Sequence, residues 1–172
     1  PWTDALKNGR SFITNGPALF LSVDGKGPGS RIEASPGDRL SALVTWDSHY
    51  PTSRAELLFN GKLVAAEAFQ EGSRGGRLEA DIIAGADGWA AARLSSDTRD
   101  SFYQPVFAHT SPVYIETGRD SQEKREAAAW FDGAIDESLQ WVRTKGRFYN
   151  DSQRKEIEDL FREGQQVYRA IG

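Results

Sequence analysis

The chain has 172 residues, of which 38% are hydrophobic and 11% aromatic, and its formal net charge is −4. A folded chain of this length buries roughly 70% of the surface that it exposes when unfolded, so we expect one domain, or one domain with a small appendage. The negative net charge argues against a nucleic-acid-binding protein, because no basic field attracts phosphate. The absence of cysteine excludes disulfides and thiolate metal sites, and no apolar run approaches the ~20 residues of a membrane span.

The sequence contains no methionine and begins at Pro1, so we expect a piece of a larger protein. Any targeting signal would then lie upstream of Pro1. The compartment is therefore left open, and we expect a soluble domain from a cytoplasmic or exported bacterial protein.

Residues 1–118 have the pattern of a β domain. Short apolar stretches alternate with Gly, Pro, Asn, Asp and Ser at the spacing typical of an antiparallel β-sandwich, and we predict an immunoglobulin-like one. The clearest local signal is Asn60-Gly61, which joins two apolar runs and predicts a type I′ hairpin. Residues 72–76 have the composition of a mobile loop. The predicted strands cover residues 18–23, 40–46, 55–59, 62–69, 78–83, 89–96 and 112–116.

Residues 119–172 are predicted to form a two-helix hairpin. The first helix covers about 121–144, with a capping box that starts at Asp120, and the second follows an N-cap at Asn150. Two helices with one apolar stripe each are not stable alone, so they must pack on each other and on the sandwich, or on a domain outside this chain. The stripes consist of Trp130, Phe131, Ala134, Ile135, Leu139 and Val142, and of Ile157, Leu160, Phe161, Gly164, Val167, Tyr168 and Ile171.

A turn motif between Arg10 and Pro17 provides three candidate site residues. Asn15 and Gly16 suit a left-handed backbone, and Pro17 fixes the entry into the next strand. This structural interpretation leaves Arg10 and Thr14 unexplained, and a guanidinium beside a sharp turn can position a carboxylate or an anionic ligand. Arg10, Thr14 and Asn15 are therefore either turn residues or contributors to a neighbouring site.

The sequence does not contain a recognisable catalytic constellation. His49 and His109 lie 60 residues apart, outside any His-x-His or His-Glu-x-x-His pattern. His49 falls in an expected polar turn, and His109 is either a hydrogen-bonded structural histidine or a fourth site residue. There is no Gly-x-Ser-x-Gly elbow, so we assign no catalytic residue, metal ligand or cofactor to this chain. Two carboxylate pairs, expected to be solvated, are Asp97 with Asp100 and Asp132 with Asp136.

Four segments carry a family likeness: Gly9–Pro17, Val23–Gly25 with Pro28–Gly29, Phe59–Lys62 and Ala108–Tyr114. They resemble the C-terminal region of carbaryl-hydrolase-type metallohydrolases, which are similar to the polymerase-and-histidinol-phosphatase (PHP) superfamily. The resemblance implies that a metal-binding α/β barrel precedes Pro1, that its last helix or a linker ends near the start of this chain, and that a helical tail follows the sandwich. It implies a divalent metal in the barrel alone, because the His-x-His ligands of the family have no counterpart here.

The leading hypothesis is a non-catalytic accessory domain of a larger metal-dependent hydrolase. The domain would pack against the catalytic domain of the same polypeptide and shape its active-site rim with the four candidate residues. One alternative is a carbohydrate-binding sandwich, which predicts an exposed row of aromatic rings such as Trp89 with Tyr103. A further alternative is oligomerisation through the apolar stripes of the helical hairpin.

Overall fold

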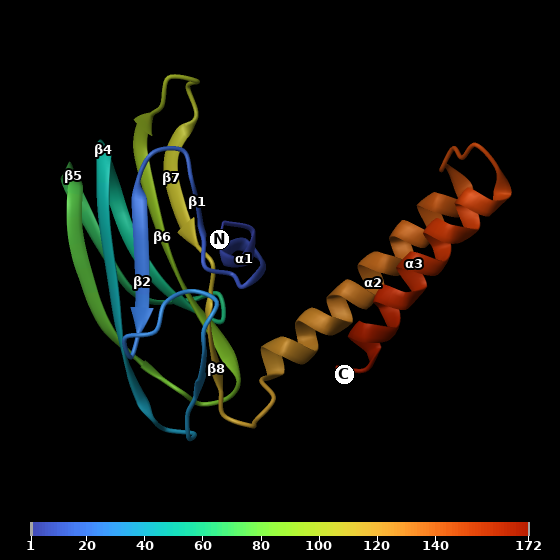
Figure 1. The fold of residues 1–172 in the computed structure, drawn as a ribbon, viewed down its shortest axis with the longest axis horizontal. Helices are drawn as coiled ribbons and strands as arrows, with labels where there is room; N and C mark the ends of the chain where they lie inside the picture. Colours follow the sequence, from blue (N-terminus) through green and yellow to red (C-terminus); the bar gives the residue numbers. More distant parts are fainter. Residues whose placement is uncertain (1, 172) are drawn as a thin grey trace. The chain divides into compact units, whose positions relative to one another are not determined.

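The computed structural model describes residues 2–171, without the side chain of Glu71. The chain divides into two compact units, Pro1–Arg119 and Asp120–Gly172. The first is built mainly from strands and the second from two long helices, so the structure is mainly β with a helical C-terminal part (Figure 1). Among the described residues, no helix carries an apolar stretch long enough to cross a bilayer.

The elements follow the chain in a simple order. The first unit contains α1 (Trp2–Lys7), β1 (Phe12–Thr14), β2 (Ala18–Val23), β3 (Arg31–Glu33), β4 (Arg39–Phe59), β5 (Lys62–Ile83), β6 (Gly88–Arg99), β7 (Pro105–Thr110) and β8 (Val113–Glu116). The second contains α2 (Gln122–Thr144) and α3 (Asp151–Arg169).

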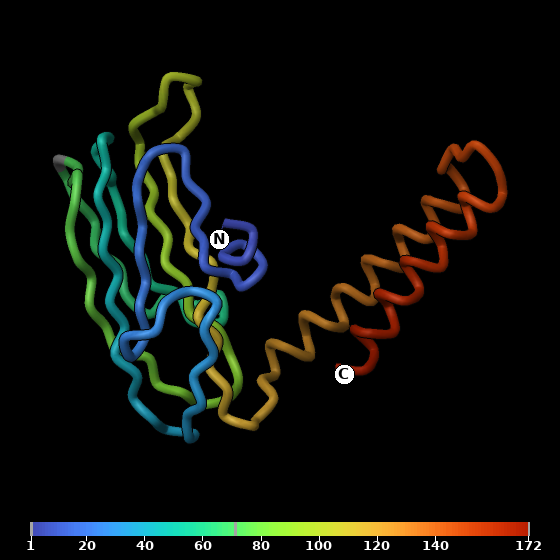
Figure 2. Tube along the Cα trace, viewed as in Figure 1, coloured from blue at the N-terminus to red at the C-terminus, as the bar shows by residue number. Residues whose placement is uncertain are grey.

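The strands form one continuous sheet in the order β1-β7-β6-β4-β2, with β5 alongside β4 and with β8 linking β3 to β6. Most neighbours are antiparallel, as predicted, but β3 and β8 pair in parallel, so the prediction of a purely antiparallel sheet is wrong at this pair. Strands β2 and β6 belong to different parts of the sheet and still contact each other, because the sheet turns back on itself around one core (Figure 2). The core contains buried side chains from β2, β4, β6 and β8.

The long hairpin of β4 and β5 makes this turn possible. Asn60 and Gly61 have φ values of 49° and 77°, which confirms the predicted hairpin. The first half of β4 pairs with β2 and the second half, from Arg54, pairs with β6. The pairing register of β4 with β5 shifts between Asp47 and Arg54, and such irregularities bend strands. The predicted polar turn around His49 is therefore wrong, since β4 continues through it.

The predicted mobile loop at residues 72–76 is also wrong, because these residues belong to β5 and pair with β4. A Cβ atom at Gly76 would lie 2.5 Å from the Trp46 ring, which is itself only 5% exposed. The glycine is needed because an aromatic ring covers the strand at this point, and not because the chain is flexible.

The second unit is an antiparallel helical hairpin. Helix α2 begins after Ser121, whose hydroxyl oxygen accepts a hydrogen bond from the Lys124 N–H at 3.1 Å, so the predicted capping box at Asp120 is wrong. The predicted N-cap of α3 is confirmed, since the Asn150 side chain accepts a hydrogen bond from the Gln153 N–H at 2.8 Å. Both caps satisfy backbone donors that the helix leaves free.

Candidate functional site

The segments Gly9–Pro17 and Ala108–Tyr114 lie side by side, although about a hundred residues separate them. Strand β1 pairs antiparallel with β7, so that Ile13 lies opposite His109 and Thr14 lies opposite Ala108. Cross-strand partners share one face of a sheet. Ile13 and His109 therefore lie on the outer face, away from the core, whereas Ala108 is buried on the inner face.

Thr14 and Asn15 hold the end of β1 against β7. The Thr14 hydroxyl donates to the Phe107 carbonyl at 3.1 Å and accepts from the Gly16 N–H at 2.9 Å. The Asn15 amide donates to the Pro105 carbonyl at 3.0 Å, and its oxygen accepts from the Phe107 N–H at 2.8 Å. These side chains reinforce the pairing where β1 ends, beside a last backbone hydrogen bond from the Asn15 N–H to the Phe107 carbonyl at 3.3 Å, as Asn and Thr commonly do at turns.

The turn does not use the expected left-handed backbone, because neither Asn15 nor Gly16 has a positive φ. A Cβ atom at Gly16 would instead lie 2.8 Å from a ring carbon of Tyr50. The glycine is required by the close approach of that ring.

Asn15 also fixes the loop between β6 and β7. Its amide donates to the Asp100 carboxylate at 3.0 Å, and the same carboxylate accepts the N–H groups of Phe102 and Gln104 at 2.8 and 2.9 Å. The hydrogen bond from Gln104, with those from Phe102 and Asn15, lowers the pKa of Asp100 against a smaller opposing effect of desolvation. The loop presents the rings of Phe102 and Tyr103, which are 82% and 79% exposed.

A charged cluster lies on the outer face beside the β1–β7 edge. Glu56 of β4 is only 6% exposed, and its carboxylate accepts a hydrogen bond from Arg54 Nε at 2.6 Å and another from Arg93 Nε. The bond from Arg93, followed by that from Arg54, lowers the pKa of Glu56 although burial acts in the opposite direction. His109 lies next to Arg93 in the strand register. The cluster carries two guanidinium groups for one carboxylate, so its charge is positive.

This cluster forms one wall of a shallow depression of about 420 Å³, which is lined by Arg54, Glu56, Arg93, Ser95, Phe107 and His109 among others. Phe107, which lines it, is 42% exposed, and Ile13, which lies opposite His109 in the strand register, is 70% exposed. We call Ile13, Phe107, His109, Arg54 and Arg93 the edge face. Its chemistry suits the binding of an apolar surface that carries acidic groups.

Arg10 lies apart from the other candidate residues. It lines a separate hollow of about 350 Å³ together with Phe12, Phe20 and Pro28. Phe12 and Phe20 meet edge to face, with ring centroids 6.0 Å apart, and so connect β1 to β2. Thr14, Asn15 and His109 are thus brought to one edge of the sheet, whereas Arg10 belongs to a different depression from His109.

The two helix carboxylates singled out in the sequence contribute to packing. Asp132 accepts a hydrogen bond from Arg169 at 2.8 Å, and Asp136 accepts one from Gln165 at 2.7 Å. The expectation of a solvated pair holds for Asp136, which is exposed, whereas Asp132 is only partly exposed, and both acids also join α2 to α3. Within residues 2–171 there is also no group of three or more His, Asp or Glu side chains arranged to hold a metal ion.

Sequence reasoning missed Glu56, its two arginines and Phe107. The available signal was the alternation of charged and apolar residues from Arg54 to Leu57, which is typical of a half-buried strand. That pattern does not predict that Arg93, 37 residues later, lies opposite Glu56.

The expected row of exposed aromatic rings is not formed by Trp89 and Tyr103. Trp89 lies at the start of β6 and Tyr103 lies beyond its end, which separates them by about 30 Å at the usual rise of a strand. Trp46, another large aromatic ring of the β unit, is buried in the core.

No family model matches the chain, and no curated protein matches it. Solved structures with weak similarity to the chain include the following three. A lytic polysaccharide monooxygenase from Jonesia denitrificans is 18% identical, with a TM-score of 0.33, 54% of this chain covered and 61% of its own. Fibronectin(III)-like modules of CbhA from Clostridium thermocellum are 19% identical, with a TM-score of 0.32 and coverages of 56% and 96%. The C-terminal domain of Wzt is 10% identical, with a TM-score of 0.36 and coverages of 62% and 76%. Likeness of this degree establishes no relationship and no shared function.

Proposed function

We propose that this chain is a non-catalytic accessory domain of a larger metal-dependent hydrolase, an immunoglobulin-like sandwich with a helical tail that packs against the catalytic domain of the same polypeptide. Its role there is to support the catalytic domain and to shape the rim of its active site. Any divalent metal belongs to the catalytic domain. The sequence resemblance motivates the proposal, and the edge face supports it.

The observation that carries the proposal is the exposure of Ile13 on an edge strand. Among the described strands, β1 stands at the end of the strand order, and none pairs with its other side. Exposed apolar edges invite association, and proteins normally protect them. Here Ile13 is 70% exposed and lies opposite His109, which in turn lies opposite Arg93 in the next strand. Two of the four segments that carry the family likeness, Gly9–Pro17 and Ala108–Tyr114, contribute to this surface.

The test uses the intact polypeptide that contains this chain. Ile13→Asp is compared with Ile83→Asp, a matched substitution of an isoleucine that is 53% exposed in β5. We expect the wild-type protein to unfold in one cooperative transition that includes both domains. Ile13→Asp should separate the transitions by several degrees and lower hydrolase activity, whereas Ile83→Asp should do neither. Equal behaviour of the two variants would refute the assignment of the contact to the edge face.

A second measurement tests the non-catalytic role directly. The 172-residue chain is incubated with Zn²⁺, Mn²⁺ or Mg²⁺ and with ester and phosphoester substrates. We expect no turnover above the metal alone. Robust metal-dependent turnover that survives further purification would exclude the accessory role.

A carbohydrate-binding module is the second candidate function, favoured by one observation. The Asp100 carboxylate fixes a loop that exposes the rings of Phe102 and Tyr103, and rigid exposed rings are suited to stacking on sugars. A glycan array should then show binding that Tyr103→Ala abolishes and Trp89→Ala retains. The accessory-domain proposal predicts no glycan binding by either form.

A further inference from the structure

The two sides of the helical hairpin differ in chemistry. On one side, polar bonds join the two helices. They connect the first half of α2 to the end of α3, and the end of α2 to the first half of α3. These bonds are Arg169 to Asp132 at 2.8 Å, Gln165 to Asp136 at 2.7 Å and Arg143 to Glu158 at 3.2 Å. This side of the hairpin is therefore complete without a further partner.

The opposite side is apolar across both helices. Trp130 meets Phe131 edge to face, and Phe131 stacks on Tyr168 of α3, with ring centroids 5.0 Å apart in each pair. Much of this side is open to solvent, since Trp130 is 67%, Trp141 57%, Leu160 64% and Val167 62% exposed. With about 150–250 Å² for a whole aromatic side chain, these residues and Phe131 expose on the order of 600 Å². That is at the upper end of the largest apolar patch on ordinary monomers, and such patches commonly mark interaction sites.

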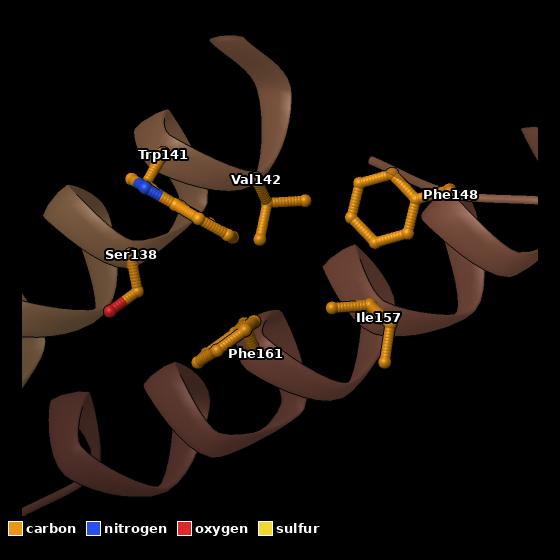
Figure 3. A pocket seen from close by; sticks show the side chains of 6 residues that line it. All are labelled: Ser138, Trp141, Val142, Phe148, Ile157 and Phe161. Carbon is orange, nitrogen blue, oxygen red and sulfur yellow. The ribbon is translucent and has the colours of Figure 1, made fainter. Parts of the chain in front are cut away.

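The apolar side also contains a hollow into which a side chain can insert. Trp141 and Val142 of α2 and Ile157 and Phe161 of α3 point toward one another, and Phe148 of the connecting segment closes one end (Figure 3). The hollow has a volume of about 340 Å³. Its walls are almost entirely carbon, so it suits a leucine or an aromatic ring of a partner.

An acidic rim borders this apolar side. Each of its four most exposed apolar residues follows a glutamate by four positions, which is one helical turn. The pairs are Glu126 with Trp130, Glu137 with Trp141, Glu156 with Leu160, and Glu163 with Val167. Among the described residues, no ion pair involves any of these four glutamates. We call the four glutamates and the four apolar residues the acid-rimmed face.

We propose that the acid-rimmed face binds a basic amphipathic helix of a partner protein, which completes a three-helix bundle. The apolar stripe of that helix covers the tryptophans, and its lysines or arginines pair with the glutamates. A second copy of this chain is the poorer occupant, because an isologous interface would oppose glutamate rims of like charge. The inference does not depend on the proposed function, since it concerns a different unit of the chain.

The test uses the full 172-residue chain and two synthetic 18-residue amphipathic peptides. One consists of leucine and lysine, and the other has glutamate in place of every lysine. By calorimetry, the lysine peptide should bind at least tenfold more tightly than the glutamate peptide. Its affinity should fall as NaCl rises from 0.05 to 0.5 M, because salt screens exposed charges. Trp141→Ala should weaken binding about tenfold, since buried tryptophans dominate such interfaces.

Two variants with the same net charge separate a specific face from general attraction between unlike charges. In the first, the four rim glutamates become glutamine, and lysine-peptide affinity should fall about tenfold. In the second, four neutral residues of the β unit become lysine, and affinity should change less than threefold. These four are Thr3, Ser35, Ala66 and Gln70, all exposed. Circular dichroism checks that both variants keep the helix content of the wild type.

Three outcomes overturn the proposal. The first is equal affinity for the two peptides, or no binding by either. The second is an equal loss of affinity in the two charge variants. The third is a dimer of the chain alone that grows stronger with added salt and in the rim-to-glutamine variant, which would assign the face to a second copy.

Discussion

Two Arg-x-Glu pairs in neighbouring strands offer a controlled test of the charged cluster. In β4, Arg54 bonds to Glu56, and in β5, Arg77 bonds to Glu79. The spacing and residue types are identical. The side chain of Glu56 is 8% exposed, whereas that of Glu79 is 61% exposed. Replacing each glutamate by glutamine therefore changes the same charge in a buried and in a solvated setting.

The structure gives an expected magnitude for Glu56→Gln. Hydrogen bonds to charged groups contribute about 1.5–3 kcal/mol each, and Glu56 accepts one from Arg54 and one from Arg93. Both guanidinium groups are about half exposed, so water can replace part of the hydrogen bonding that they lose with the carboxylate. The side-chain oxygen of the glutamine also keeps one weaker hydrogen bond to an arginine. We expect a loss of about 2 kcal/mol in the free energy of unfolding of the β unit. For Glu79→Gln we expect less than about 0.5 kcal/mol, as for other exposed pairs.

The pH dependence provides an independent check on the mechanism. The hydrogen bond from Arg93, with that from Arg54, holds the pKa of Glu56 below its ordinary value of 4.5 in the folded chain. A carboxyl with a lowered folded pKa contributes stability that is full above the unfolded pKa and is lost as the pH falls through the folded one. The difference between wild type and Glu56→Gln should therefore be constant from pH 7 to about 5 and shrink below that.

The assay must report on the β unit alone, since the chain has two compact units. Urea unfolding followed by tryptophan fluorescence serves this purpose in a background in which Trp130 and Trp141, both exposed, are replaced by phenylalanine. The reasoning is refuted if Glu56→Gln and Glu79→Gln cost the same, or if the cost of Glu56→Gln persists unchanged at pH 3.5.

Two further substitutions test the packing that positions the site. Gly76→Ala should lower the stability of the β unit by about 1–3 kcal/mol, because the new methyl group would lie 2.5 Å from the buried Trp46 ring; Gly85→Ala, with open space around it, should change urea unfolding by less than about 0.5 kcal/mol. Asn15→Ala should cost about 1–2 kcal/mol through its two bonds to the β7 backbone and raise the pKa of Asp100, measured by NMR titration; an unchanged pKa contradicts the assigned loop geometry.

Local signals in the sequence predicted local structure well. Asn60-Gly61 predicts its hairpin because a type I′ turn needs positive φ at both positions, and few other residue pairs accept that. Asn150 predicts the start of α3 because its side chain bonds within the next three residues. Both predictions concern contacts between neighbours in the chain, where composition and geometry are closely coupled.

Predictions failed where a distant residue decided the local structure. Residues 72–76 have the composition of a loop, yet they belong to β5, which pairs with β4, and Gly76 is required there because a Cβ atom would lie 2.5 Å from the Trp46 ring. Gly16 in the Arg10–Pro17 turn is likewise required by the close approach of the Tyr50 ring, and not by a positive φ at this position. In both cases a tertiary contact explains a residue that turn statistics explain differently.

The candidate site depends on pairing between strands that are far apart in sequence. Of its four predicted residues, Thr14, Asn15 and His109 reach one edge, because β1 and β7 pair there. The cluster of Glu56, Arg54 and Arg93 was not predicted, because the residue pattern of one strand does not indicate which other strand pairs with it. Among the described residues of the site, the buried charge is that of Glu56 on the outer face, and its position beside Arg93 follows only from the three-dimensional register.

The apolar stripe of α2 is wider than the surface that α3 covers. At about 100° per residue, the apolar positions of α2 from Trp130 around to Leu139 cover roughly half of the helix circumference. One neighbouring helix buries a much narrower arc, and in α2 the residues that become buried are Ala128, Leu139 and Val142. The part of the stripe that stays exposed contains Trp130 and Trp141. Burial of such large aromatic side chains contributes more free energy than burial of smaller ones. A hairpin selected to stand alone would have placed polar residues on that arc, so its composition indicates a third element that approaches from the side bordered by the four glutamates.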